Sequence, residues 1–254
     1  MVTGTNGVGL RAGDKKGVTA TIMTTLPKKT FRTRLKTNRH LLRLAYYPWV
    51  VLPRRPRRAA SIAGVWWLQV FKRARGIHRR LEPTPPSKMF SLSFWGVPQV
   101  DVATYTLTVD GAVERPTTLT LAEVQELPAI ERDVTLDCVG GSRNNCTMRG
   151  VPIADLMHRA GAKEEALTAI FHCADGYFTT HPVRDLLEDR AFMAYATNGV
   201  GDRDHGYPLR LVAPGKYGYK WAKWVVRIEL VAGSPKGYWE QRGLPDRARV
   251  GDVS

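Results

Sequence analysis

The chain has 254 residues, 43% of them hydrophobic and 24% charged, which is enough apolar length to bury the core of a large globular domain. Its net charge of +15 is uneven, because residues 1–82 carry 19 Lys and Arg against 2 acidic residues (19 − 2 = +17) and residues 83–254 carry 19 against 21 (19 − 21 = −2). Three cysteines without a CxxC spacing argue against a disulfide framework and a structural zinc cluster, and they fit a reducing compartment.

The N-terminal third is predicted to be a basic, partly disordered extension. Residues 1–30 are rich in Gly, Thr and Lys and show no periodic apolar face, which is typical of disorder. Residues 31–82 alternate basic clusters with aromatic residues, and residues 59–81 are compatible with a helix. This pattern suits an anionic membrane surface. A solvated tail is the alternative, and nucleic acid, which basic tails bind non-specifically, is not favoured.

The localisation signals of this extension are incomplete. The longest apolar windows, Leu44–Leu52 and Ala59–Phe71, are shorter than the roughly 18 to 20 residues that a membrane-spanning helix needs. Arg57 and Arg58 resemble a twin-arginine export signal, but they lie far from Met1 and no small-residue cleavage site follows them. A cytoplasmic location with contact to a membrane surface is therefore favoured over export.

The proline-rich stretch Glu82–Ser87 is interpreted as a linker that separates residues 1–82 from a globular domain at residues 83–254. In that domain, alternating polar and apolar residues predict strands, Asp110–Gly111 predicts a turn, and Thr120–Glu123 forms a capping box at the start of a helix. Further strands are predicted at Val134–Val139, Leu167–Cys173, Tyr177–Thr180, Ala191–Ala196, Tyr207–Ala213 and Trp224–Val231, and helices at Pro152–Gly161 and Val183–Leu187. Short helices among many strands indicate an α+β fold with mixed sheets.

One segment, Asp133–Gly141, carries the chemistry that stands out. An extended β-branched run ends at Cys138, and Gly140 and Gly141 then allow the backbone to turn sharply or to approach a ligand. A thiol in this place can ligate a soft metal or act as a nucleophile. An isolated cysteine in an apolar strand is more often an inert core residue, so the residues alone leave both interpretations open.

Five segments follow the order and spacing of one known family: Tyr105–Gly111, Thr135–Gly141, Arg149–Leu156, Asp204–Trp224 and Gly237–Glu240. From Phe90 onward, over about two thirds of the chain, the sequence resembles the molybdenum-cofactor domain of the sulfite oxidase family. That family includes bacterial catalytic subunits that reduce methionine sulfoxide in proteins. The resemblance implies the sulfite-oxidase-type molybdopterin-binding fold and an oxidoreductase that transfers oxygen atoms.

The resemblance also implies a pyranopterin dithiolene that carries molybdenum, with Cys138 as the catalytic residue and the protein ligand to the metal. A thiolate is a soft donor that suits such a centre. The implied cofactor-binding residues are Cys138, Cys173, His205, Arg210, Lys220, Trp221, Ala222 and Lys223. Cys173 falls where the family often has Ser or Thr, and a packed core thiol is an equal alternative there.

Departures from the family pattern concern the substrate. Leu92 stands where sulfite oxidases have a sulfite-binding arginine, and Leu244 stands where they have an active-site tyrosine. These losses favour reduction of an S- or N-oxide over oxidation of sulfite. Ser142–Cys146 is interpreted as a loop, in which Arg143 either adds positive charge to the pocket or points into water. A sulfite-oxidising enzyme and a catalytically degenerate binding module remain the alternatives.

The implied partners are a small-molecule substrate and a separate electron-transfer protein. No CxxCH haem motif occurs in the sequence, so electrons have to be exchanged with another protein. The basic and aromatic residues 31–82 are the candidate site for contact with a membrane surface.

Overall fold

The computed structural model describes residues 82–93 and 95–251, with a few isolated positions between residues 60 and 74. The predictions of disorder at residues 1–30 and of a basic helix near residues 59–81 fall mostly outside the described residues. In the described part of the chain, no helix is both long and apolar enough to cross a membrane.

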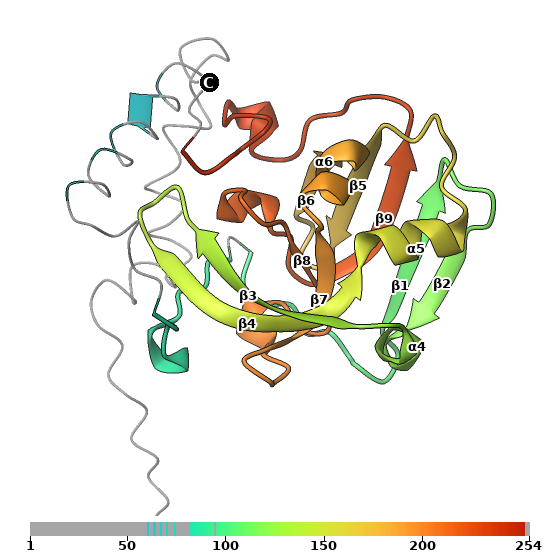
Figure 1. The fold of residues 1–254 in the computed structure, drawn as a ribbon, viewed down its shortest axis with the longest axis horizontal. Coiled ribbons are helices and arrows are strands. Elements are labelled where there is room, and N and C mark those ends of the chain that lie inside the picture. The colour runs from blue at the N-terminus through green and yellow to red at the C-terminus, as the bar shows by residue number, and fades with distance from the viewer. Residues whose placement is uncertain are drawn as a thin grey trace, which may run out of the picture.

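Five strands form the larger of two sheets, in the order β2–β1–β9–β5–β6 (Figure 1). These strands are β1 (Thr106–Gly111), β2 (Thr117–Thr120), β5 (Thr168–Cys173), β6 (Phe178–Pro182) and β9 (Val225–Val231). Strands β1 and β9 run parallel, and every other neighbouring pair is antiparallel. The sheet is therefore mixed, as the sequence predicted.

The smaller sheet has four antiparallel strands in the order β3–β4–β7–β8. These strands are β3 (Ile130–Asp137), β4 (Arg143–Pro152), β7 (Phe192–Thr197) and β8 (Arg210–Val212). Figure 1 shows β3 and β4 as a long curved hairpin. The register between β4 and β7 shifts at Arg149 and Gly150, where a Cβ on Gly150 would lie 1.9 Å from the carbonyl oxygen of Met193. Glycine is therefore required at this bulge.

Three short helices connect the strands: α4 (Leu121–Glu126), α5 (Ile153–Ala160) and α6 (Val183–Glu188). The predicted capping box of α4 is present, with the Thr120 hydroxyl accepting from the backbone N–H of Glu123 and the Glu123 carboxylate accepting from that of Thr120. Helix α5 ends at Gly161 in the left-handed conformation, at φ 65°. The start of α4 and the end of α5 therefore follow from local sequence signals.

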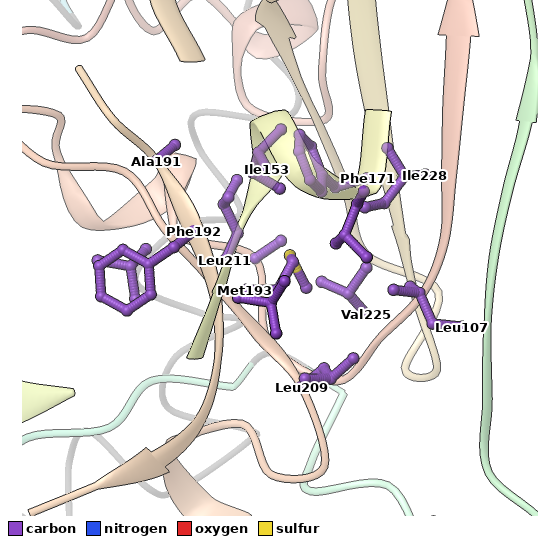
Figure 2. Packing of buried hydrophobic residues seen from close by; sticks show 14 of the residues in the cluster. Leu107, Ile153, Phe171, Ala191, Phe192, Met193, Leu209, Leu211, Val225 and Ile228 are labelled. Atoms are coloured by element: carbon purple, nitrogen blue, oxygen red, sulfur yellow. The ribbon is translucent and has the colours of Figure 1, made fainter. Parts of the chain in front are cut away.

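The core lies where the two sheets and α5 meet (Figure 2). Phe171 of β5 and Ile228 of β9 face Ile153 of α5, and Met193 and Leu211 come from the smaller sheet. Each of these side chains is at most 1% exposed. This packing fixes the two sheets relative to each other, and with them the segment between β8 and β9.

Two expectations from the sequence are corrected by the smaller sheet. Ser142–Cys146 is not a loop, because β4 begins at Arg143 and only residues 138–142 form the connection. The strand expected at Tyr207–Ala213 is confined to Arg210–Val212, and a 3-10 helix at Arg203–His205 precedes it. In both places hydrogen bonds to distant backbone and side-chain atoms, and not local propensity, decide the conformation.

Polar residues at the start of β4 bind the proline-rich stretch. The backbone N–H of Thr84 donates to the carbonyl oxygen of Asn145 at 2.8 Å, and the amide of Asn145 donates to the carbonyl oxygen of Glu82 at 3.0 Å. The side chain of Asn144 accepts from the N–H of Phe90 at 3.1 Å and donates to its carbonyl oxygen at 2.9 Å. The stretch interpreted as a linker is therefore attached to the domain from Glu82 onward.

Candidate active site

A cavity of about 430 Å³ opens beside the turn that joins β3 to β4. Five of the residues predicted for the site line it: Cys138, His205, Arg210, Trp221 and Lys223. Leu92 and Leu244, the two departures from the family pattern, line the same cavity. Segments that lie far apart in the sequence thus contribute to one site.

The turn between β3 and β4 fixes Cys138 at the cavity wall. The N–H of Cys138 donates to the carbonyl oxygen of Ser142 at 2.8 Å, and the N–H of Gly140 donates to Cys138 Sγ at 3.3 Å. Gly141 has a φ of 90°, which closes the turn in a conformation that favours glycine. The thiol is half-buried and is not part of a disulfide. It is therefore accessible to a ligand in the cavity.

The segment between β8 and β9 packs against this turn. Tyr217 forms a parallel bridge with Asp137, the residue before Cys138. A Cβ on Gly218 would lie 3.2 Å from Leu136 Cδ2 and 3.9 Å from the Cα of Cys138. Because Gly218 has no side chain, its backbone can approach the backbone at the end of β3. Residues from both segments, from Leu136 to Trp221, therefore line the same cavity.

His205 and Arg210 present polar atoms that have no hydrogen-bond partner in the described part of the chain. Nδ1 of His205 lies 2.7 Å from Asp202 Oδ2, and Nη1 of Arg210 donates to the carbonyl oxygen of His205 at 2.9 Å. The buried atoms His205 Nε2 and Arg210 Nε are both left unpaired. Buried polar atoms are almost always hydrogen-bonded, so this pair indicates a missing polar or anionic ligand.

Lys223 adds a half-buried cation next to Arg210. Its ammonium donates to Ser91 Oγ at 2.8 Å and to the carbonyl oxygen of Asp204 at 3.0 Å, and it lies 4.2 Å from the ring centroid of Trp224. Burial, together with the charge of Arg210, lowers the pKa of Lys223 to about 7. Burial lowers the pKa of Arg210 to about 10. An anion bound between these two groups would relieve their repulsion.

Asp175 lies between the predicted strands Leu167–Cys173 and Tyr177–Thr180, and it lines the same cavity. Its Oδ1 accepts from the N–H of Tyr177 at 3.1 Å. Burial raises the pKa of this carboxyl group, although the nearby Lys223 opposes the shift. Nothing in the sequence showed that the turn between these two strands lines the same cavity as Cys138.

Three residues implied by the resemblance do not line the cavity. Lys220 is 2% exposed, and its ammonium donates to the carboxylate of Glu240 and, at 2.6 Å, to the carbonyl oxygen of Thr180. Cys173 is a buried member of the hydrophobic core, where burial raises the pKa of its thiol well above the usual value. Ala222 is fully buried and connects Trp221 to Lys223.

Arg143 neither faces the cavity nor points into water, which corrects both expectations for it. Its guanidinium forms a bidentate ion pair with Asp137, with Nε at 2.9 Å from Oδ1 and Nη2 at 2.7 Å from Oδ2. The two side chains are only 12% and 4% exposed. This pair stabilises the base of the hairpin that carries Cys138.

Sequence reasoning also missed an aromatic wall on the other side of the cavity. Trp95, Tyr177, Tyr219 and Trp239 line it, and Arg242 lies among them. Trp95 and Tyr177 have ring centroids 6.5 Å apart. Trp95 follows the position of Leu92 by three residues, but its direction depends on packing between distant segments.

The donor set fits a molybdenum cofactor. Cys138 offers a soft sulfur ligand, His205 and Arg210 offer unpaired polar atoms, and Arg210 and Lys223 offer positive charge for a phosphate and a polar ring system. The fold and the site therefore define a class of protein, an oxidoreductase domain that binds molybdopterin. The family model described as oxidoreductase molybdopterin binding domain matches residues 94–239, and the chain belongs to this family.

Known proteins that resemble the chain support this assignment. The chain is 37% identical over 145 residues to the uncharacterized oxidoreductase YuiH of Bacillus subtilis (strain 168). The aligned region covers 56% of this chain and 73% of that protein. The chain is also 30% identical over 173 residues to a putative protein-methionine-sulfoxide reductase subunit, YedZ1, of Azospira oryzae, which covers 65% of this chain and 66% of that protein. The resemblance to the sulfite oxidase family is thereby confirmed.

A solved structure shows the same fold. The sulfane dehydrogenase SoxCD from Paracoccus pantotrophus superposes with a TM-score of 0.57 at 26% identity. The match covers 59% of this chain and 44% of that one, so the chain spans less than half of the SoxCD chain. The α+β fold with mixed sheets is confirmed, as are the molybdopterin cofactor and the oxidoreductase class.

Proposed function

We propose that this domain catalyses oxygen-atom transfer on a small S- or N-oxide, with Cys138 as the protein ligand of molybdenum. One observation carries the proposal: Cys138, the cationic cluster of His205, Arg210 and Lys223, and an apolar wall converge on a single cavity. When bound, the cofactor supplies the two-electron redox chemistry, and the protein supplies the grip, the orientation and the electrostatics.

The cationic cluster is proposed to hold the cofactor. The unpaired Nε2 of His205 can donate or accept a hydrogen bond, and Nε of Arg210 can donate one; the described residues supply a partner to neither atom. Lys223 supplies a point charge for a phosphate group, and an anion there raises its pKa and keeps it protonated. Trp221 lies 5.6 Å from the guanidinium of Arg210, which holds the arginine in place.

The reaction consumes two electrons and two protons for each S-oxide that is reduced to a thioether and water. Asp175 is a lining group whose pKa is raised by burial, so it can be protonated in the pocket. We propose that it holds a proton that the departing oxygen requires, the second proton coming from water. The electrons come from a separate electron-transfer protein, a proposal supported by the relative YedZ1, whose name describes it as a subunit.

Reduction of an oxide is favoured over oxidation of sulfite by the side chains around Leu92 and Leu244. Sulfite is a compact anion that needs several positive or hydrogen-bonding groups, and these two leucines offer none. A neutral sulfoxide or N-oxide loses less when it leaves water for such a surface. The name of YedZ1, a putative protein-methionine-sulfoxide reductase subunit, points in the same direction.

The test combines metal content with turnover. The purified full chain should contain about one molybdenum per molecule and should oxidise a reduced low-potential dye when methyl phenyl sulfoxide is added. Cys138→Ser should fold, as shown by circular dichroism, but lose both metal and turnover, whereas Cys146→Ser on β4, which does not line the cavity, should keep both. Rapid oxidation of sulfite with ferricyanide and no reduction of sulfoxides would contradict the proposal.

A further inference from the structure

Arg242 is the only cation of the described cavity lining that lies outside the cluster of His205, Arg210 and Lys223. It is the last residue of a 3-10 helix at Glu240–Arg242, which ends at Gly243 with a φ of 99°. Its Nη1 donates to the carbonyl oxygen of Tyr238 at 2.8 Å, and its guanidinium carbon lies 3.5 Å from the ring centroid of Tyr238. One face of the guanidinium is therefore covered by the ring of Tyr238, and the hydrogen bond fixes its orientation.

The ring beneath Arg242 is itself held by other aromatic side chains. Tyr238 packs edge-on against Trp95 at 5.1 Å and against Trp239 at 5.3 Å, and it lies 5.9 Å from Tyr177. Trp95, Tyr177 and Trp239 line the cavity. Arg242 thus packs on a ring that is itself held by aromatic side chains, and it lines the cavity beside them. Because its side chain is already ordered, it loses little conformational entropy when it binds a ligand.

The charge of Arg242 is not neutralised by the described residues. No carboxylate in residues 82–93 and 95–251 lies within ion-pair distance of its guanidinium, although Arg143, Arg227 and Arg249 all have such partners. Natural proteins seldom place an arginine at the wall of an apolar cavity without an acidic partner. A guanidinium with free edges in this setting matches a planar carboxylate, which it binds through two parallel hydrogen bonds.

Resting on the proposed function, we infer that Arg242 determines specificity by binding a carboxylate on the substrate, while the aromatic wall holds an apolar body that carries the S- or N-oxide. The substrate class is then a carboxylate-bearing aryl or alkyl sulfoxide or N-oxide. This role differs from that of the cluster around Arg210, because Arg242 shares no hydrogen bond with His205, Arg210 or Lys223 in the described structure.

A matched pair of substrates tests the inference. The molybdenum-loaded full chain is assayed with 4-(methylsulfinyl)benzoate and with 4-(methylsulfinyl)benzamide, which have similar size but differ in charge. The benzoate should show a kcat/KM about tenfold or more above that of the benzamide, as expected for a hydrogen-bonded charge pair. Arg242→Gln should abolish this preference by raising the KM for the benzoate more than the KM for the benzamide.

Two controls separate recognition from folding. Lys236→Gln removes an exposed cation that pairs with Asp246 outside the cavity lining, and it should leave the preference intact. If Arg242→Gln does not retain molybdenum, Arg242→Lys keeps the charge without the bidentate fork and should lower the preference. A titration of the product 4-(methylthio)benzoate, followed by the fluorescence of Trp95 and Trp239, measures binding without turnover.

The possible results separate the role of Arg242 from the proposed oxygen-atom transfer. Reduction of both substrates with equal kcat/KM in wild type, or an unchanged preference in Arg242→Gln, overturns the inference and leaves the proposed function standing. Absence of turnover with either substrate contradicts the proposed function, and the product titration then still decides for or against Arg242. A loss of sulfite oxidation in Arg242→Gln, with no change in the benzoate preference, assigns the arginine to sulfite and overturns the inference.

Discussion

At the scale of single residues, the charged side chains near the site are of two kinds: some line the cavity, and others form ion pairs with each other. Lys220 and Lys223 are neighbours in one sequence block, but only Lys223 lines the cavity. Lys220 points to Glu240, whose side chain is 1% exposed. The pair joins the segment that carries Trp221 to the segment that carries Trp239, so it connects two walls of the cavity.

This geometry makes Lys220 a positioning residue, and a double variant tests that role. Lys220→Met leaves the carboxylate of Glu240 buried without a partner, which should destabilise the fold by about 3–5 kcal/mol. Adding Glu240→Leu should restore most of that stability, because replacing both members of a buried ion pair by apolar groups is often nearly neutral. The measurements are urea unfolding and molybdenum content. A stable double variant that still lacks molybdenum would instead make Lys220 a direct cofactor contact.

Lys223 predicts a pH dependence in the cofactor-free protein. Its folded pKa of about 7 lies below the usual 10.5, so the buried ammonium opposes folding fully below pH 7, and this cost disappears as the pH rises toward 10.5. The melting temperature of the metal-free protein should therefore rise between about pH 7 and pH 10 relative to Lys223→Met. Loading with the cofactor should remove this rise, since the phosphate keeps Lys223 charged. Parallel pH profiles of the two metal-free proteins would show that Lys223 is not the group responsible.

Sequence reasoning at this scale located residues but not their directions. The motif placed Cys138, His205, Arg210, Trp221 and Lys223 in one cavity, because each lies in a segment whose order the resemblance identified. It gave no signal for Arg242, or for the orientation of Lys220. Lys220 is directed by Thr180 and Glu240, which lie 40 and 20 residues away. Arg242 is held by Tyr238, whose ring is in turn placed by the distant Trp95 and Tyr177, and no local pattern encodes these contacts.

At the scale of secondary structure, alternation of apolar residues identified most strands, and β4 was missed. Its first three residues include Asn144 and Asn145, which have low strand propensity. Their side chains are satisfied by Thr135 and by the segment between Glu82 and Phe90, so the strand forms through distant partners. The capping box of α4 and the glycine end of α5 were predictable, because those signals act within one turn.

The bulge in β4 makes a prediction about Gly150. In Gly150→Ala the added Cβ would lie 1.9 Å from Met193 O and 2.5 Å from the Cα of Ala194, and neither backbone atom can move without disturbing β7. The substitution should destabilise the domain by about 1–3 kcal/mol, measured by urea unfolding. Gly233→Ala is the matched control, since nothing lies within 4 Å of its Cβ, and it should change stability by less than about 1 kcal/mol. Equal effects of the two substitutions would argue against a steric role for the bulge.

At the scale of the whole molecule, charge divides the chain near the proline-rich stretch that begins at Glu82. Residues 1–82 carry a net +17 (19 − 2), and residues 83–254 carry −2 (19 − 21). The two sheets and the core lie in the described residues after Glu82, whereas the described lining of the cavity also includes Gly64. The proline-rich stretch and the change in charge together predict a domain boundary near residue 82. The attachment of Glu82 and Thr84 to Asn145 depends on tertiary hydrogen bonds and was not predictable.

That attachment sets the design of the last experiment, a truncation that starts at Glu82 and so keeps the hydrogen bonds to Asn145. The truncated chain should retain molybdenum and turnover, because the cavity and its lining cations remain. The full chain should co-sediment with vesicles that contain phosphatidylserine, and the truncated chain should stay in the supernatant. Each Lys or Arg near an anionic surface contributes about 1 kcal/mol, so 19 basic residues outweigh the loss of tail entropy.

The salt and lipid dependence identifies the force that acts in this binding. Co-sedimentation should weaken between about 0.1 M and 0.5 M salt, because the Debye length falls below the separation between tail and head groups. Neutral phosphatidylcholine vesicles should bind weakly, and any binding that remains there measures the contribution of Trp49, Trp66 and Trp67 at the interface. If the truncated chain binds anionic vesicles as well as the full chain does, the basic extension is a solvated tail, and the membrane contact has to come from the folded domain.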